Sequence, residues 1–138
     1  MYNLESEFVP YNQAKALKEI GFDVPCLSYY EGESFSNHLA IVEHEGKDDY
    51  IVPAPLHQQV FGWLWEKHNL MISFKHYMAS VKSKRPYWYD IMIVSADMTK
   101  RKYDRYRLKR NIHYNTYEEA RIACIDRCIE VIKHGIEL

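Results

Sequence analysis

The sequence predicts an α+β fold in a single domain spanning residues 1–138. Three helices are expected to pack on an antiparallel sheet of about five strands, in the order α-β-β-α-β-β-β-α. The length suits one hydrophobic core, and the hydrophobic and charged fractions, 47% and 27%, are close to those of ordinary globular domains. Helix-capping residues mark both ends of the chain, and segments rich in aromatic and β-branched residues lie between them.

The first helix is predicted over residues 10–20. Pro10 suits a first helical position, and Gly21 can adopt the left-handed conformation that ends a helix. Its core face is short and consists of Ala14, Leu17 and Ile20. Residues 26–31 and 35–43 then favour a hairpin, because they are rich in Tyr, Leu, Ile and Val and flank Gly32.

Residues 50–52 can add a third short strand, and a second helix follows over residues 55–68. Its predicted apolar arc is broad and comprises Leu56, Val60, Phe61, Trp63, Leu64 and Trp65. We expect this helix to be the centre of the core. His57 and His68 lie about 16 Å apart along the helix axis, so they cannot share a ligand, and we interpret them as partly buried histidines.

The second half of the chain predicts a meander and a final helix. Strands are expected over residues 70–77, 87–95 and 102–109, and the middle one carries bulky side chains on both faces, as a central strand requires. Thr116 and Glu119 have the spacing of a capping box for the last helix. Its predicted apolar stripe comprises Ala120, Cys124, Ile125, Cys128, Val131 and Ile132, and Gly135 is placed to end it.

Few residues suggest catalysis, so we expect a protein without a cofactor or a metal. Five scattered glycines provide no phosphate-binding loop, and three cysteines have no zinc or disulfide spacing. The acidic residues near 43–49 are expected in a solvated turn, although such a cluster could in principle hold Mg²⁺. Asp90 is the better candidate for a perturbed carboxylate, and its simplest partner is Arg105 or Arg107.

The most distinctive stretch is residues 100–110, KRKYDRYRLKR, in which seven of eleven residues are basic. Arginine can bind phosphate in a bidentate manner and aromatic rings can stack on bases, so basic and aromatic residues together favour a nucleotide or single-strand binder. A structural explanation is also open, since tyrosine favours strands and lysine protects sheet edges. The candidate ligand-binding residues are Arg85, Trp88, Arg101, Tyr103, Arg105, Tyr106, Arg107 and Lys109.

Charge is unevenly distributed along the chain. Residues 1–52 contain ten acidic and three basic side chains, a balance of −7, and residues 53–138 have a balance of +6. Such an asymmetry can attract an anionic partner or hold two parts of one domain together. No segment is apolar enough to span a membrane and the N-terminal residues are acidic, so we expect an intracellular, cytoplasmic protein.

Several stretches resemble a known group of proteins. Uncharacterised small proteins of Bacteroidetes phages and prophages have segments similar to four stretches of this chain. These are EFVPY at residues 7–11, IVPAPL at 51–56, QQVF at 58–61 and TYEEA at 116–120. The resemblance covers most of the chain, but it lies in helix starts and core positions. It implies a phage accessory or counter-defence protein acting in a bacterial host cell, and it implies no activity.

These observations favour binding over catalysis. The expected partner is a phosphate-bearing ligand, either a signalling nucleotide or a short nucleic acid, held by the basic stretch and its aromatic neighbours. The alternative is a protein-interaction module whose basic face docks on an acidic host protein or on residues 1–52 of a second copy. An enzyme would need a pocket containing Asp90 and one of the histidines.

Overall fold

The structure is a computed structural model, and it describes residues 4–36, 50–76, 87–93, 106–107 and 114–134. The chain divides into two compact units, residues 1–63 and 64–138. Helix α2, His57–His68, crosses the boundary between them in sequence. The α+β class is confirmed. The single sheet of about five strands is not: the described strands form two three-stranded antiparallel sheets, ordered β2-β1-β3 and β4-β5-β6.

The first unit begins with the 3-10 helix η1, Leu4–Glu7, and helix α1, Tyr11–Glu19. The predicted stop of α1 is confirmed, because Gly21 has a φ of 98°. The amide of Gly21 donates to the Lys18 carbonyl and that of Phe22 to the Leu17 carbonyl, which is the Schellman arrangement. Leu17 and Phe22 are both buried, so the chain leaves the helix with its apolar contact in place.

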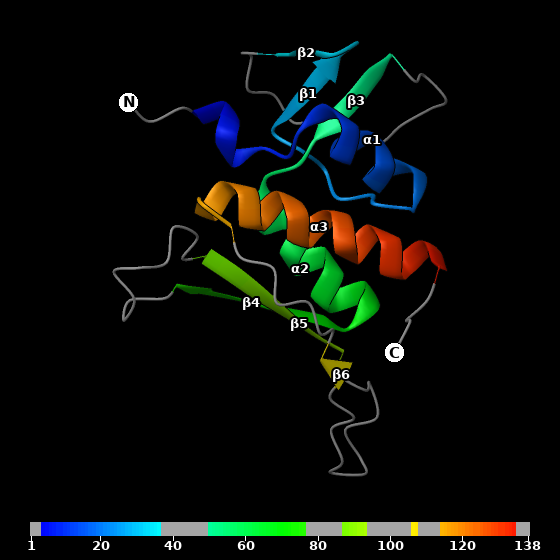
Figure 1. The fold of residues 1–138 in the computed structure, drawn as a ribbon. Coiled ribbons are helices and arrows are strands. Elements are labelled where there is room, and N and C mark those ends of the chain that lie inside the picture. The colour runs from blue at the N-terminus through cyan, green and yellow to red at the C-terminus, as the bar shows by residue number, and fades with distance from the viewer. Residues whose placement is uncertain (1–3, 37–49, 77–86, 94–105, 108–113, 135–138) are drawn as a thin grey trace. The chain divides into compact units, whose positions relative to one another are not determined.

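A three-stranded sheet completes the first unit. It consists of β1 (Ser28–Glu31), β2 (Ser34–Phe35) and β3 (Ile51–Ala54), and Figure 1 shows α1 beside β3. The predicted hairpin is confirmed at its turn, where Gly32 has a φ of 58°. The rest of the predicted second strand falls in residues 37–49, outside the described part. β3 pairs with β1 and lies at an edge of this sheet, a position that tolerates the missing amide proton of Pro53.

Tyr30 joins several segments of the first unit. Its hydroxyl donates a hydrogen bond to the Val9 carbonyl at 2.7 Å, and both residues are buried. Its ring contacts Tyr11 edge-on, with centroids 5.6 Å apart, and Phe35 at 5.5 Å. Strand β1 therefore holds the chain that enters α1 through the hydrogen bond to Val9 and the ring contact with Tyr11.

Helix α2 is narrower in its buried face than predicted. Val60 and Leu64 are fully buried, whereas Trp65 is 45% exposed. At about 100° per residue, Trp65 lies about 140° around the helix from Val60, which is outside the face that Val60 and Leu64 define.

The expected burial of His57 is confirmed, because it is only 2% exposed. The half-buried position of His68 lowers its pKa through loss of solvation.

The second unit contains β4 (Leu70–His76), β5 (Tyr87–Ile93), β6 (Tyr106–Arg107) and α3 (Tyr117–His134). The predicted meander is present, with β5 central. Of the predicted last strand only Tyr106 and Arg107 are described. α3 begins as predicted, because the Glu119 amide donates to the Thr116 hydroxyl at 3.1 Å. The carboxylate of Glu119 accepts from the amide of Asn115 rather than from that of Thr116.

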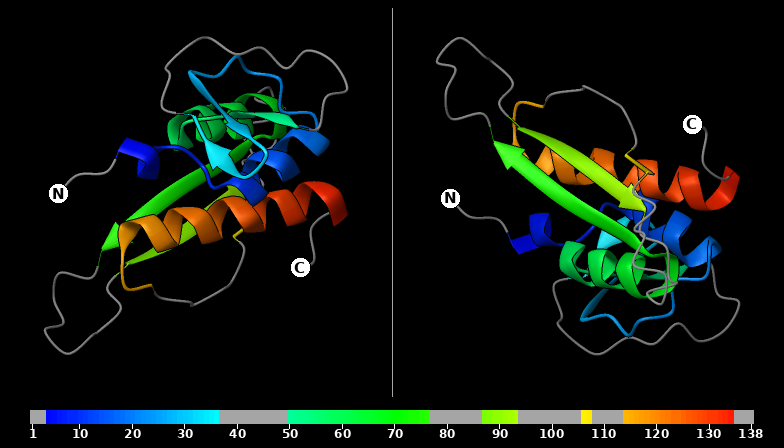
Figure 2. Two further views of the ribbon diagram at one scale, coloured as in Figure 1. Left: turned by 90° about the horizontal axis from the view of Figure 1, so that it is seen from above. Right: turned by 90° about the horizontal axis from the view of Figure 1, so that it is seen from below.

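α3 covers one face of the β4-β5-β6 sheet. Figures 1 and 2 show the helix running over β4 and β5, and α3 and β5 are in contact. The predicted stripe is largely confirmed, although Ile132 is only half-buried. The buried residues of α3 are Ala120, Arg121, Cys124, Ile125, Cys128, Ile129 and Val131.

Candidate functional site

The sheet of the second unit has two chemically different faces, which follow from the register of its strands. β4 pairs with β5 from Leu70 opposite Ile93 to His76 opposite Tyr87. Because directly opposed residues belong to the same face and alternate residues change face, this register sorts the residues into two sets. We call the face covered by α3 the inner face and the opposite one the outer face.

The inner face is apolar and aromatic. Its members on β4 and β5 are Leu70, Ile72, Phe74, Tyr89, Ile91 and Ile93. Ile91 is only 1% exposed, and Phe74 contacts Tyr117 of α3 edge-on, with ring centroids 5.1 Å apart. Burial raises the pKa of the Tyr89 hydroxyl above its ordinary value, and the neighbouring Tyr114 adds to this effect. These contacts identify the inner face as part of the core of this unit.

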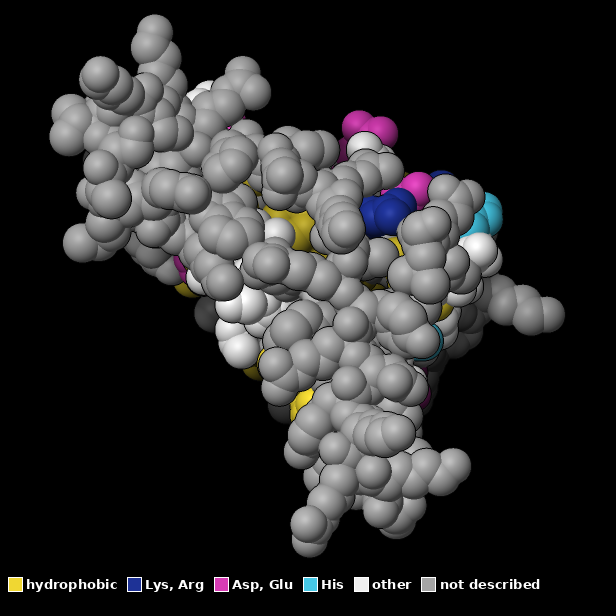
Figure 3. All heavy atoms as spheres, turned by 60° about the horizontal axis from the view of Figure 1, so that its bottom comes forward, with side chains coloured by type: hydrophobic (Ala, Val, Ile, Leu, Met, Phe, Trp, Pro, Cys, Tyr) yellow, Lys and Arg dark blue, Asp and Glu magenta, His cyan; other side chains and the backbone are white. Residues whose placement is uncertain are grey.

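The outer face has mixed polarity. By register its members are Met71, Ser73, Lys75, Trp88, Asp90, Met92 and, on β6, Arg107. Met71 is 40% exposed and Ser73 is half-buried, so the side chains described here meet solvent. Figure 3 views the molecule with the bottom of Figure 1 turned forward, and it shows exposed hydrophobic atoms among the described side chains.

Three of the eight sequence-predicted site residues lie in described strands. Trp88 stands opposite Lys75, Arg107 opposite Met92, and Tyr106 opposite Ile93. Trp88 and Arg107 therefore share the outer face, whereas Tyr106 belongs to the inner face. The other five lie outside the described residues: Arg85, Arg101, Tyr103, Arg105 and Lys109. Asp90 pairs with Ser73 of β4 in the strand register. The predicted ion pair of Asp90 with Arg105 or Arg107 lies outside the described side chains.

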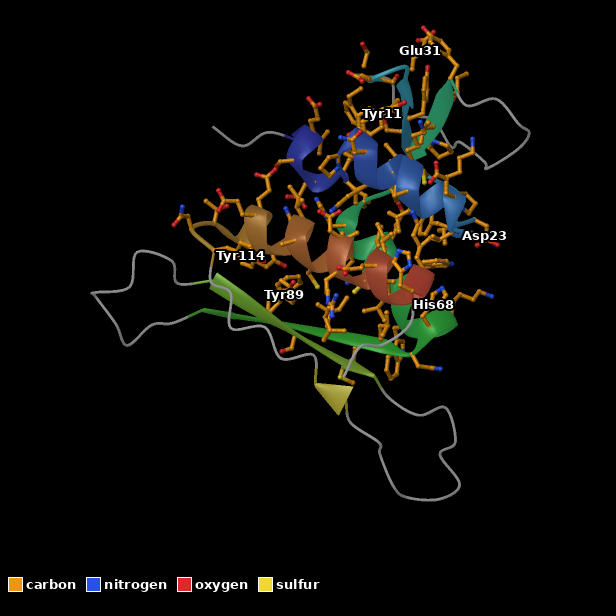
Figure 4. All side chains as sticks on the ribbon, turned by 45° about the vertical axis from the view of Figure 1, so that its right-hand side comes forward. Tyr11, Asp23, Glu31, His68, Tyr89 and Tyr114 are labelled. Carbon is orange, nitrogen blue, oxygen red and sulfur yellow. The ribbon has the colours of Figure 1, made fainter. Side chains whose placement is uncertain are left out.

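An aromatic cluster at the start of α3 has no counterpart in the predicted site. Tyr89 and Tyr114 stack with centroids 6.0 Å apart and ring planes 16° from parallel. Both residues are labelled in Figure 4. The Arg121 guanidinium lies 4.8 Å from the centroid of the Tyr117 ring. The sequence signal for this cluster is the spacing of Tyr117 and Arg121, one helical turn apart, which places a cation beside an aromatic ring.

The three cysteines are buried thiols in the structure. Burial raises the pKa of Cys26 to about 12, and its sulfur donates to the Val24 carbonyl at 3.3 Å. Burial raises the pKa of Cys124 as well, and its hydrogen bond with Cys128 adds to the shift. A thiol that stays protonated is a poor nucleophile and a poor metal ligand, so Cys26 and Cys124 act as apolar core groups in the folded state.

Within the described ranges, no group of three or more His, Cys, Asp or Glu side chains is arranged to hold a metal ion. The acidic residues near position 45 lie outside those ranges. No described helix combines the length and the apolar character needed to cross a bilayer.

Comparison with known proteins gives no family assignment. Neither the protein-family models, nor the curated proteins, nor the solved structures contain a significant match to this chain.

Proposed function

We propose that the protein binds a phosphate-bearing ligand, a nucleotide or a short nucleic acid, on the outer face beside the basic stretch of residues 100–110, and that it acts by binding rather than by catalysis. The observation that carries the proposal is the register of β6. In this register Arg107 pairs with Met92 of β5, and Met92 and Trp88 belong to the same alternate set of residues in that strand. A guanidinium and an indole on one face are the two groups that bind phosphate and stack on a base.

The occupied inner face supports this choice of surface. α3 contacts β5, whose residues Tyr89 and Ile91 lie on the inner face, whereas Met71 on the outer face is 40% exposed. The seven basic residues of the stretch would add long-range attraction, because the local positive charge raises the concentration of anions nearby. In a phage accessory protein, such binding would sequester a nucleotide of the host's defence, and we extend the proposal to this counter-defence role.

Thermal-shift measurements of the full chain against cyclic and linear nucleotides test the proposal. A ligand at 100 times its Kd stabilises the folded state by about 2.7 kcal/mol, which raises Tm by roughly 5 to 10 °C for a chain of this size. The Arg105→Ala/Arg107→Ala variant should lose this shift. Lys15→Ala/Lys67→Ala is the matched control, since it removes the same charge at exposed helix positions. If no phosphate compound stabilises the chain, the proposal is overturned.

Salt dependence distinguishes a polymer from a small ligand. Binding of a nucleic acid releases counterions from each neutralised phosphate. The affinity of the protein for a nucleic acid should therefore fall by orders of magnitude between about 50 and 200 mM salt, as it does for DNA-binding proteins. A mononucleotide carries few charges and releases few counterions, and its affinity should change much less over the same range.

The uneven charge along the chain favours one alternative, a protein-interaction module. The −7 balance of residues 1–52 and the +6 balance of the remainder make the chain complementary to an acidic protein or to a second copy of itself. Light scattering coupled to size exclusion tests this at low and high salt. A dimer that dissociates with salt, combined with no nucleotide binding, would support the interaction module over the nucleotide binder.

A further inference from the structure

The sheet of the first unit has an open edge at the start of β3. Among the described strands, β3 pairs with β1 on one side only. In an antiparallel ladder, alternate residues direct their N–H and C=O groups to opposite sides of the strand. The Gly32 amide donates to the Tyr50 carbonyl at 2.8 Å, so position 50 faces β1 and the N–H and C=O of Ile51 point to the edge. Pro55 keeps this alternation, because its carbonyl accepts from Val9 rather than from β1.

Two apolar side chains are exposed at this end of β3. Tyr50 is 59% exposed and Ile51 is 40% exposed. The Tyr50 ring lies against the hairpin turn, because a Cβ added to Gly32 would stand 3.4 Å from its Cε2 atom. Exposed apolar groups beside an open strand edge are typical of a place where a second chain adds a strand.

Two carboxylates border these apolar groups. Glu31 stands directly opposite Ile51 in the register, and opposed side chains have Cβ atoms about 4.5 to 5.5 Å apart. Glu33 follows Gly32 in the hairpin turn. Both glutamates are exposed, and Figure 4 labels Glu31 at the end of the hairpin. Residues 28–36 and 50–56, which form the described part of this sheet and its exit, contain no lysine or arginine.

We propose that this acidic edge, formed by Glu31, Glu33, Tyr50 and Ile51, binds an extended, arginine-rich segment of another protein as an added strand. Pairing with the backbone of Ile51 requires an extended partner. Arginine complements the other groups, because its guanidinium can stack on an aromatic ring and pair with a carboxylate.

The acidic edge belongs to the first unit, so this binding activity goes beyond the proposed function. It rests on that function in one respect only. The basic stretch of residues 100–110 is assigned there to a phosphate-bearing ligand, and the arginine-rich segment is therefore supplied by a different protein rather than by a second copy.

Fluorescence polarisation of a labelled synthetic peptide, in which arginine alternates with threonine, tests the acidic edge on the full chain. Glu31→Gln/Glu33→Gln should weaken peptide binding about 3- to 20-fold, since each exposed ion pair contributes modestly. Glu66→Gln/Glu118→Gln is the matched control, because it removes the same charge at exposed positions of the second unit. The control should leave the affinity unchanged.

Ile51→Pro isolates the contribution of the backbone. Proline lacks the N–H that would pair with the peptide, and no hydrogen bond to β1 is lost, because Ile51 faces the edge. Pro53 already occupies the equivalent position two residues further along β3. Ile51→Pro should lower the affinity about 3- to 10-fold, whereas Ile51→Val should retain it. A peptide with lysine in place of arginine should bind more weakly, since an ammonium group stacks less well on Tyr50.

Three results would overturn this assignment: no binding of the arginine peptide, equal losses in the two glutamine double variants, or unchanged affinity in Ile51→Pro. A wild-type dimer that Glu31→Gln/Glu33→Gln dissociates, measured by light scattering, would identify a second copy as the occupant and overturn the choice of a different protein. The glutamate substitutions lie at exposed positions, so they decide the matter even if Ile51→Pro does not fold. Nucleotide binding is measured separately by thermal shift, and its failure would refute the proposed function without changing the peptide result.

Discussion

Replacing Tyr30 by phenylalanine removes one hydroxyl from the core of the first unit and little else. The ring keeps its contacts with Tyr11 and Phe35, whereas the Val9 carbonyl loses a hydrogen bond of 2.7 Å in a buried site. An ordinary hydrogen bond contributes about 0.5 to 1.5 kcal/mol, and an unsatisfied buried carbonyl adds a desolvation cost. We expect Tyr30→Phe to lower the free energy of unfolding by about 1 to 2 kcal/mol.

Urea unfolding followed by circular dichroism measures this difference, and Tyr29→Phe is the control. Tyr29 is the preceding residue of β1, on the opposite face, and is only half-buried. Its hydroxyl should therefore matter less, with an effect of about 0.5 kcal/mol or below, as for surface substitutions in general. Equal effects of the two substitutions would refute the assignment of the Tyr30 hydrogen bond to the stability of this unit.

The same variant has a pH signature. Burial, with a smaller contribution from Glu5, raises the pKa of Tyr30 to about 12 from its ordinary value near 10. Above pH 10 the unfolded chain ionises at this tyrosine and the folded chain does not, so ionisation favours unfolding. Stability from this group is complete below pH 10 and is lost as the pH rises towards 12. The difference in stability between wild type and Tyr30→Phe should therefore shrink over that interval, and a constant difference would contradict the shift.

Three further experiments test the helix ends and the core. Gly21→Ala should lower the free energy of unfolding by about 1 to 2 kcal/mol, because Gly21 has a φ of 98°. Gly62 lies in the exposed middle of α2 with open space around it, so Gly62→Ala should raise the free energy of unfolding by up to about 1 kcal/mol in the same urea assay. Effects of the same sign in the two variants would contradict this prediction. Thr116→Ala should lose about 1 kcal/mol and Thr116→Ser should retain most of it, and equal losses would argue against the cap. A water-soluble thiol reagent at pH 8 should label none of the buried cysteines in the native protein and all three in guanidinium chloride; rapid native labelling would show that the thiols are accessible.

Local signals in the sequence were sufficient for the helix ends and the hairpin turn. Gly21 and Thr116 act through atoms within four residues of themselves, so their roles do not depend on the rest of the fold. The alternation of residues 87–93 likewise identified a central strand. These elements could be predicted because their stabilising contacts are near in sequence.

Longer-range choices could not be predicted in the same way. Strand patterns do not specify partners, and nothing local states that β3 pairs with β1 while β4 begins a separate sheet. The exposure of Trp65 shows a related limit, since an apolar side chain is not always buried. For the candidate site, the sequence supplied the residue types of Trp88 and Arg107, and strand alternation separates Arg107 from Tyr106, but only the register shows that Arg107 pairs with Met92 and Tyr106 with Ile93.

The continuity of α2 has a practical consequence for dissecting this chain into parts. The division between residues 63 and 64 falls inside a twelve-residue helix, and a cut there would leave two fragments of about two turns or fewer. Isolated helices of that length are scarcely populated in water. Split-protein or truncation experiments should therefore keep His57 to His68 intact within one fragment and supply the rest of the chain as the other fragment.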